Sequence, residues 1–251
     1  MASFLTFEPV VRYAEVKSTN DIAAEYGARG DAEGIVVVAG SQTAGRGRFA
    51  RSWHSPPGAG LYVSVLLRPP NDVARLLTLA GGVALCEAVR ESTGLAAIIK
   101  WPNDLLAPGG RRKLAGILVE ASATGRGVEY AVFGFGLNIR ATAYPPDLLG
   151  RATSLEEELG RAVDEDRLLD SCLAALARRY EDLLHGREQS VLGRWRELAP
   201  DAVGAPIEWT RDGRRLSGVS AGIDADGALL AQTPHGIERI VSGEVTWCFS
   251  Q

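Results

Sequence analysis

Glycine and arginine alternate within residues 41–53, SQTAGRGRFARSW, and place three permanent positive charges on a conformationally free backbone. The three cations are Arg46, Arg48 and Arg51, and Trp53 follows them. Glycine adopts positive-φ conformations and lets the backbone approach a ligand closely. Guanidinium groups bind carboxylate or phosphate oxygens through paired hydrogen bonds. The stretch therefore indicates a loop that folds over an anion such as a nucleotide phosphate, and a solvated or nucleic-acid-contacting loop is the alternative.

A second group of polar residues occurs in KWPND, residues 100–104, and in KLAGILVE, residues 113–120. Pro102 fixes its own φ and restricts the residue before it, so the chain is extended up to this point and turns there. The polar residues presented at this strand end are Lys100, Asn103 and Asp104. Lys113 begins the next strand, and Gly116 within it indicates close approach of a ligand or another backbone. An ordinary polar turn and a solvated lysine are the alternatives.

Two further stretches are candidates for the same site. Ser18, Thr19 and Asn20 precede the helical run IAAEYGA. Residues of this kind cap helices, but the free N–H groups of a helix N-terminus can also share a polar ligand. The strand VEYAVFGFGLN carries glycine at 134 and 136 and ends at Asn138, which leaves room for a group packed against its backbone.

Several common catalytic patterns are missing from the sequence. There is no GxxxxGK(S/T) phosphate loop, no GxGxxG after a strand, no GxSxG nucleophile elbow at a strand-to-helix turn and no HExxH. What remains is a set of cations and one carboxylate beside strands whose glycines leave room for a ligand. Such a site can bring two anions together and stabilise the charge that develops on transfer. We therefore predict nucleotide-dependent activation of a carboxylate, whose identity these residues do not give.

Composition restricts the class of protein. The 251 residues are 46% hydrophobic and 23% charged, which is ordinary for a soluble globular protein. The formal charge of −4 counts against a nucleic-acid-binding domain, which is usually basic. No secretory signal and no apolar run of membrane-spanning length occurs. Three widely spaced cysteines favour a reducing compartment without a structural metal. These features predict a cytoplasmic protein without a membrane segment.

Hydrophobic periodicity and turn residues predict an α/β region followed by a small antiparallel barrel. The expected strands of the first region cover residues 10–16, 34–39, 61–67, 97–99, 105–120 (a hairpin with the turn APGGRR) and 128–138. The expected helices cover residues 22–28, 71–93, 152–159, 164–184 and 193–198. After Pro200 the expected strands cover residues 206–210, 216–223, 228–233 and 237–241, separated by RDG, DADG and PHG. We place a domain boundary near residue 200.

The ordered set of motifs closely resembles the biotin protein ligases. The motifs are STN at 18–20, QTAGRGR at 42–48, SW at 52–53, KWPND at 100–104, KLAGILVE at 113–120 and GFGLNI at 134–139. The run GVSAGIDADGALLAQ is similar to the small C-terminal domain of that family. Bifunctional members carry an N-terminal helix-turn-helix domain, and here the ligase motifs begin almost at the first residue. The sequence therefore resembles the ligase-only form.

The resemblance implies a class II synthetase-like α/β (α+β) catalytic domain with a mixed sheet, residues 1–200, and an SH3-like β-barrel, residues 201–251. It also implies two half-reactions. Biotin reacts with ATP, with Mg²⁺ as cofactor, to give biotinyl-5′-AMP and pyrophosphate. A lysine of a biotin carboxyl carrier protein then takes the biotin and releases AMP. No nucleic-acid or membrane partner is expected, and the expected state is a monomer or weak homodimer.

The resemblance assigns roles to sixteen residues. Biotin would be bound by Ser18, Thr19, Asn20, Gln42, Gly45, Arg46, Gly47, Arg48, Lys113 and Gly116. The nucleotide would be bound by Arg48, Arg51, Trp53, Lys100, Asn103 and Asn138, and Asp104 would bind the metal. The catalytic residues would be Lys113, Arg48 and Arg46. One departure affects the loop: Phe49 and Ala50 stand where the family commonly has a basic residue and then glycine.

Three other functions are compatible with parts of this pattern. A lipoate or octanoate ligase or transferase has a related fold, although the pair KWPND and KLAGILVE favours biotin. A sensor would bind biotin or a nucleotide without turnover. A nucleic-acid-binding module would use the arginine loop, against the acidic balance of the chain.

Overall fold

The larger sheet of the protein is built from the β-branched, aliphatic and glycine-rich runs of the first 138 residues. The computed structural model describes residues 5–125, 127–141 and 144–248. Its seven-stranded sheet has the order β1-β2-β3-β7-β6-β5-β4. The strands are β1 Val10–Tyr13, β2 Val36–Ala39, β3 Gly60–Leu67, β4 Ile98–Lys100, β5 Asp104–Leu106, β6 Lys113–Thr124 and β7 Gly127–Asn138. β1 pairs with β2 in parallel, and every other neighbouring pair is antiparallel, so the sheet is mixed as predicted.

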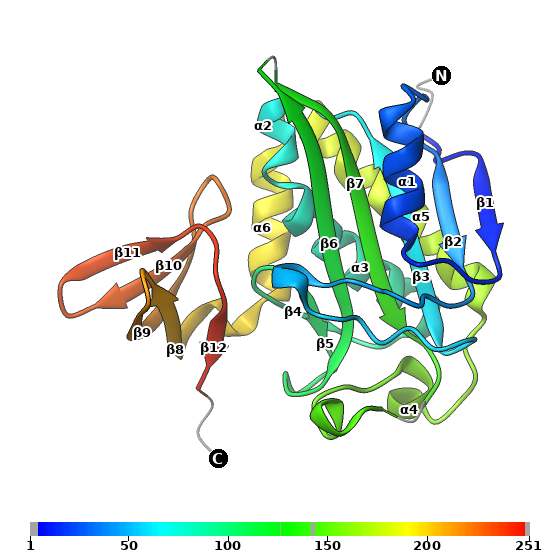
Figure 1. Cartoon of the computed structure of the whole chain (residues 1–251). Coiled ribbons are helices and arrows are strands. Elements are labelled where there is room, and N and C mark those ends of the chain that lie inside the picture. The colour runs from blue at the N-terminus through cyan, green and yellow to red at the C-terminus, as the bar shows by residue number, and fades with distance from the viewer. Residues whose placement is uncertain (1–4, 126, 142–143, 249–251) are drawn as a thin grey trace.

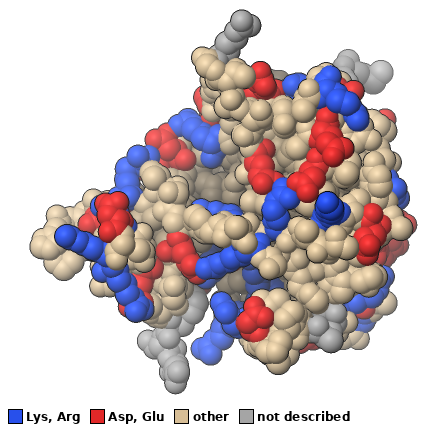
Figure 2. All heavy atoms as spheres, viewed as in Figure 1, with Lys and Arg blue, Asp and Glu red and all other residues tan. Residues whose placement is uncertain are grey.

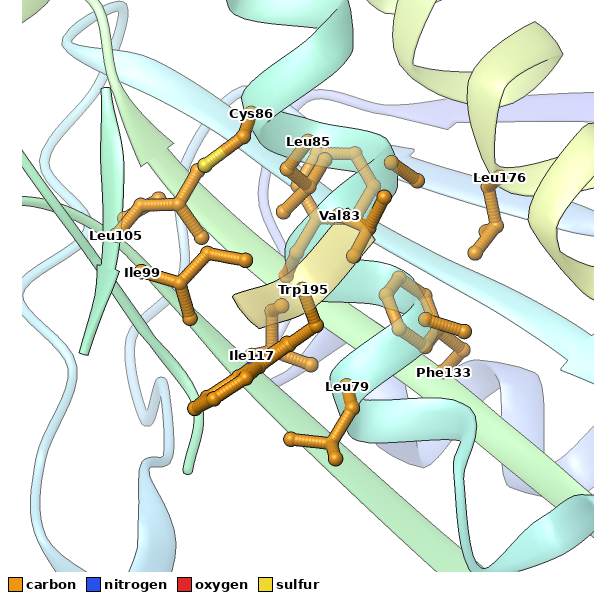
Figure 3. Close-up of a cluster of buried hydrophobic side chains, with 14 of the residues drawn as sticks. Leu79, Val83, Leu85, Cys86, Ile99, Leu105, Ile117, Phe133, Leu176 and Trp195 are labelled. Carbon is orange, nitrogen blue, oxygen red and sulfur yellow. The ribbon is translucent and has the colours of Figure 1, made fainter. Parts of the chain in front are cut away.

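Helices cover both faces of this sheet (Figure 1). Helix α1, Thr19–Ala28, lies on one face over β3 and β7. On the other face lie α3, Leu77–Thr93, α5, Glu165–Leu184, and α6, Glu188–Leu198. Figure 3 shows how side chains of these three helices meet those of β4 to β7, with Trp195 of α6 and Phe133 of β7 among them, both fully buried. Burying this apolar surface fixes the sheet edge that carries the polar motifs.

The helix predicted over residues 71–93 is interrupted. It forms α2, Asn71–Ala74, and then α3. The Asp72 carbonyl accepts a hydrogen bond from Arg75 Nε at 2.9 Å, and the N–H of Leu76 donates to Val73 instead, so the α-helical pattern stops there. Glycine at 81 does not break α3. A Cβ at that position would lie 2.1 Å from the Phe133 ring, so the glycine lets α3 pack closely on β7.

Residues 146–202 provide the elements that close one end of the sheet and lead to the second one. They form α4, Leu155–Leu159, α5 and α6, together with short 3-10 turns at Pro146–Leu148 and Pro200–Ala202. Asp164 caps α5, because its side chain accepts from the N–H of Arg167. Helix α6 begins at Glu188, five residues before the predicted start at 193, because its first three residues, 188–190, are polar and show no apolar periodicity.

The C-terminal residues form a five-stranded antiparallel sheet with the order β11-β10-β9-β8-β12. The strands are β8 Val203–Arg211, β9 Arg214–Ile223, β10 Leu229–Thr233, β11 Gly236–Ile240 and β12 Val245–Trp247. Gly213, Gly227 and Gly236 adopt positive φ in the turns that RDG, DADG and PHG predicted. β12 was not predicted, because three residues give no alternation to detect. A mixed α/β region followed by an antiparallel β domain confirms the predicted fold class.

The second sheet contacts the turn between β4 and β5. The indole Nε1 of Trp101 donates to the carbonyl of Gly227 at 3.0 Å. The ammonium group of Lys100 lies 5.4 Å from the ring centroid of Trp247, within the range of a cation–π interaction. The C-terminal domain therefore touches the KWPND motif directly. No helix in the described ranges is long and apolar enough to cross a membrane.

Candidate active site

One cavity of about 1150 Å³ brings the predicted residues together. It is lined by all sixteen of them, from the start of α1, the loop that follows β2, the β4–β5 turn, and the strands β6 and β7. Figure 2 shows the hollow near the centre of this face, with lysine and arginine side chains gathered around it. Stretches separated by more than a hundred residues in sequence thus share one space.

The start of α1 binds the loop after β2 through the side chain of Gln42. Both the N–H and the hydroxyl of Thr19 contact Gln42 Oε1, at 2.9 and 3.2 Å. Gln42 Nε2 donates to Ser55 Oγ at 3.0 Å. Ser18 occupies the N-cap position, but its side chain makes no capping hydrogen bond. The polar residues before the helix therefore serve the cavity wall more than the helix end.

Ser64 on β3 is a residue that the sequence interpretation missed. It is fully buried, and its hydroxyl lies 2.6 Å from Asn20 Oδ1 and 2.8 Å from Thr19 Oγ1. Gly134 pairs with Ser64 across the sheet, and a Cβ there would lie 2.1 Å from Asn20 Oδ1. The sheet therefore fixes Asn20 in two ways: the hydroxyl of Ser64 hydrogen-bonds it, and Gly134 leaves room for it. The single serine in the apolar run GLYVSVLL was the available signal.

Arg46 is engaged by carboxylates of the protein. Its guanidinium lies 2.7 Å from Asp21 and 3.1 Å from Glu120, and Glu120 also accepts from Asn20 Nδ2 at 2.6 Å. Burial lowers the pKa of Arg46, but these hydrogen bonds outweigh it and leave the pKa raised. The sequence interpretation treated Arg46 as a cation directed at a ligand. In this structure it links α1 to β6.

Lys113 stands between a carboxylate and an aromatic ring. Its Nζ lies 2.6 Å from Asp104 Oδ1 and 5.2 Å from the ring centroid of Trp53. The backbone of Lys113 is fixed on both sides, since its N–H donates to the Arg151 carbonyl at 2.8 Å and its carbonyl accepts from Thr153 at 3.0 Å. The backbone that carries the ammonium group is therefore fixed at the cavity wall.

Trp53 packs on two glycines that face each other across β6 and β7. Gly116 pairs with Gly136. A Cβ would lie 3.1 Å from the Trp53 ring at Gly116 and 2.2 Å at Gly136, so these positions hold the indole against the sheet only because they carry no side chain. Trp53 Nε1 is buried without a partner among the described residues. The space expected beside these glycines is therefore present, and the Trp53 indole packs into it.

Arg48 and Lys100 make no ion pair within the described ranges. Burial lowers the pKa of Arg48, and the nearby Asp104 charge opposes this. Burial also lowers the pKa of Lys100, Asp104 opposes it, and the charge of Lys113 adds to the lowering. Crowding of positive groups with few carboxylates is unfavourable until an anion enters. This side of the cavity therefore favours a negatively charged ligand.

The remaining predicted residues hold the backbone around the cavity. Asn103 Nδ2 donates to the Ile117 carbonyl at 2.8 Å, and Asn138 Nδ2 donates to the Thr153 carbonyl at 2.9 Å. Arg51 forms an ion pair with Glu244, in the segment before β12. The C-terminal domain therefore contributes to this site, which the sequence interpretation did not foresee.

The loop departs from the family pattern at two positions and still turns sharply. Phe49 and Ala50 both adopt left-handed φ, 57° and 56°, a region that costs a residue with a side chain on the order of 1 kcal/mol. The loop is closed by hydrogen bonds from Gly47 to Arg51 at 2.7 Å and from Trp53 to Gly45 at 2.8 Å. Ala50 accepts this conformation where the family commonly has glycine.

Comparisons with known proteins agree with this site. Residues 13–138 match the Biotin/lipoate A/B protein ligase family, and the chain belongs to that family. Residues 203–246 match the Biotin protein ligase C terminal domain. Together with the relatives below, this places the chain among the biotin protein ligases.

The chain is similar to named ligases and to a solved ligase structure. The bifunctional ligase/repressor BirA of Bacillus subtilis is 34% identical over 92% of this chain and 71% of its own length. The biotin–[acetyl-CoA-carboxylase] ligase of Paracoccus denitrificans is 35% identical over 83% of this chain and 88% of its own. The structure of the Aquifex aeolicus biotin protein ligase in complex with biotin and ATP superimposes with a TM-score of 0.82 at 28% identity, covering 97% of this chain and 100% of that one.

Proposed function

We propose that the cavity activates biotin with ATP and transfers it to a lysine of a carrier protein. In the first half-reaction a carboxylate oxygen of biotin attacks the α-phosphorus of ATP. The P–O bond to the β-phosphate breaks, and its electron pair leaves with pyrophosphate. In the second, the neutral ε-amine of the acceptor lysine attacks the carbonyl carbon of biotinyl-5′-AMP. The single bond between the carbonyl carbon and the phosphate oxygen breaks, AMP leaves with the electron pair, and the nitrogen loses a proton to water.

The residues divide between the two substrates. Ser18, Thr19 and Gln42 hydrogen-bond the ring of biotin at the wall beside α1, and Gly45, Gly47 and Gly116 line the loop and the pocket around it. Asn20 and Arg46 hold that wall in place. The fixed orientation of the Gln42 amide supports this division. Its Oε1 accepts from the N–H of Thr19, and its Nε2 donates to Ser55 Oγ.

Lys113 acts between the two reacting groups. Two anions repel each other as they approach, and a cation between them lowers that repulsion and stabilises the charge on the pentavalent phosphorus. Arg48 and Lys100 contribute the same stabilisation from the nucleotide side, and Arg51 with Asn103 and Asn138 orders the surrounding backbone. The indole of Trp53 offers adenine a stacking surface. The shared position of Lys113, beside both Asp104 and Trp53, supports this assignment.

Asp104 is the residue that would hold Mg²⁺. No group of three or more His, Cys, Asp or Glu side chains suited to a metal occurs among the described residues. Mg²⁺ commonly takes one or two carboxylates and completes its shell with phosphate oxygens and water, so a single carboxylate fits the ion when ATP is present. The ion would neutralise phosphate charge.

The observation that carries the proposal is that all sixteen candidate residues line one cavity. One side of it has cations without an ion pair among the described residues, and the other side has a neutral polar network. The test is ATP-dependent transfer of labelled biotin to a carrier fragment, with lipoate as the competing substrate. Transfer of biotin and not of lipoate is expected. Absence of biotinyl-5′-AMP after incubation with biotin, Mg²⁺ and ATP would overturn the proposal. The carrier's identity, the cytoplasmic location and the monomer or weak homodimer stay predictions.

A further inference from the structure

The wall of the cavity has a charge opposite to that of the whole chain. Seven basic residues line it: Arg46, Arg48, Arg51, Lys100, Arg111, Lys113 and Arg151. Three acidic residues line it: Asp104, Asp147 and Glu244. The chain as a whole has a formal charge of −4. The excess of positive charge is therefore concentrated at this site.

Among the residues that the structure describes, carboxylates pair with three of these cations. Arg46 contacts Asp21 and Glu120, Arg51 contacts Glu244, and Lys113 contacts Asp104. In the part of the chain that the structure describes, the other four form no ion pair; they are Arg48, Lys100, Arg111 and Arg151. The family resemblance gives roles to the first two. It gives none to Arg111 and Arg151.

Both arginines sit on backbone that is held in place. The carbonyl of Arg151 accepts from the N–H of Lys113 at 2.8 Å, and residue 152 forms a parallel bridge with Lys113. Arg111 lies in the β5–β6 turn, two residues before Lys113. Its neighbour Arg112 pairs with Glu157 and Glu158 beside α4, whereas Arg111 lines the cavity.

Arg151 shares its space with the buried cation Lys100. After burial and the charges of other neighbours, the charge of Arg151 also contributes to the lowered pKa of Lys100. Within the described ranges, the guanidinium of Arg151 makes one long hydrogen bond, 3.5 Å to the Asp147 carbonyl, so its other donors are available there. Positive groups held together without counter-charges fit a ligand with several negative charges, and guanidinium groups bind phosphate oxygens in pairs.

We propose that Arg111 and Arg151 bind the β- and γ-phosphates of ATP and hold the pyrophosphate as it leaves. The inference rests on the proposed function and adds to it a place for the leaving group. When the bond between the α-phosphorus and the bridging oxygen breaks, the electron pair passes to pyrophosphate, which gains negative charge while the new carboxylate–phosphorus bond forms. Two guanidinium groups bind these phosphate oxygens in the ATP complex and stay on the oxyanion as it leaves.

The test separates the two half-reactions with the variants Arg111→Gln, Arg151→Gln and the double variant. Charge-assisted hydrogen bonds support an increase in KM for ATP of about 10-fold in each single variant and about 100-fold in the double variant. Transfer of biotin from preformed biotinyl-5′-AMP to a carrier fragment contains no pyrophosphate and is expected to stay at the wild-type rate. Arg214→Gln on β9, which does not line the cavity, is the matched control.

Calorimetry with inorganic pyrophosphate gives a second readout that needs no turnover. The wild-type chain is expected to bind pyrophosphate, and the double variant at least 10-fold more weakly. A double variant with wild-type KM for ATP and wild-type pyrophosphate affinity would overturn the inference. An equal loss in both half-reactions would also overturn it, because it would indicate a role in folding or in binding the adenylate. If the wild-type chain binds pyrophosphate but makes no adenylate, the proposed function fails instead.

Discussion

The two sides of the cavity are built on different physical principles. On the side of α1, Thr19, Gln42 and Ser64 form a neutral hydrogen-bond network whose members satisfy one another. On the opposite side, Arg48 and Lys100 are cations without a carboxylate partner among the described residues. The first side is complete without a ligand, whereas the second is completed only by an anion.

The difference indicates how the two substrates are recognised. A preorganised neutral network binds a neutral ring by shape and by fixed donors and acceptors, with little rearrangement. Cations held close together repel one another, and a bound polyanion neutralises that repulsion. Mutations on the neutral side should therefore change mainly KM for biotin, and mutations on the cationic side should change mainly KM for ATP. The substitutions below test this difference, in decreasing order of expected effect.

The largest effect is expected at the boundary between the two sides. Replacing Lys113 with alanine removes the cation that we propose lies between the two reacting groups and takes away the lysine partner of Asp104. Biotin-dependent ATP–pyrophosphate exchange should fall by about 10³-fold, the upper range for removal of a transition-state donor. Lys17→Ala, on exposed chain outside the cavity lining, should keep full exchange. Substantial exchange in Lys113→Ala would remove the role of this residue.

Arg48→Gly tests the cationic side by itself. Loss of a charge-assisted contact should speed the release of labelled biotinyl-5′-AMP by about 10- to 100-fold. Biotin affinity in the absence of ATP should change less, because no phosphate is then present. Filter binding with labelled adenylate measures the release rate, and Arg48→Lys should restore part of the retention. Release no faster than from the wild-type chain would contradict the comparison.

Ser64→Ala tests the neutral side. The substitution removes the hydroxyl that contacts Asn20 Oδ1 and Thr19 Oγ1, while Thr19 keeps its contact with Gln42. Loss of this buried hydrogen-bond partner costs about 1–3 kcal/mol of stability and should raise KM for biotin by about 10-fold while KM for ATP stays constant. Ser220→Ala on β9 removes an equally buried hydroxyl that donates to Asp201. It should lower the melting temperature without changing either KM. A parallel rise in both KM values would mean that the two sides are not independent.

The smallest effect is a change in pH dependence. Burial lowers the pKa of Lys100 below the ordinary lysine value, so Lys100 loses its proton at a lower pH than a free lysine. Its charge attracts phosphate only below that lowered pKa. KM for ATP should therefore increase as pH rises toward about 10, and the increase should be smaller in Lys100→Arg, since arginine stays charged. Initial rates at several pH values measure this, and identical profiles for the two proteins would exclude Lys100 as the titrating group.

The sequence by itself determined the chemistry of the site. Alternating glycine and arginine, the lysine at the start of β6 and the paired glycines of β6 and β7 are local patterns, and each has a local physical reason: backbone freedom, permanent charge or room beside a strand. The hairpin of β5 and β6 and the turns of the C-terminal sheet followed from the same kind of reasoning, because turn residues act on their own neighbours.

Tertiary structure decided which of these charges are free. Arg46 and Arg48 are two residues apart and look equivalent in sequence, yet Arg46 is paired with Glu120, 74 residues away, while Arg48 has no carboxylate partner in the described ranges. Arg51 meets Glu244 across 193 residues, and Ser64 reaches the start of α1 only because β3 passes beneath it. Such pairings depend on how distant segments pack, since charge and hydrogen bonding act through space and not along the chain.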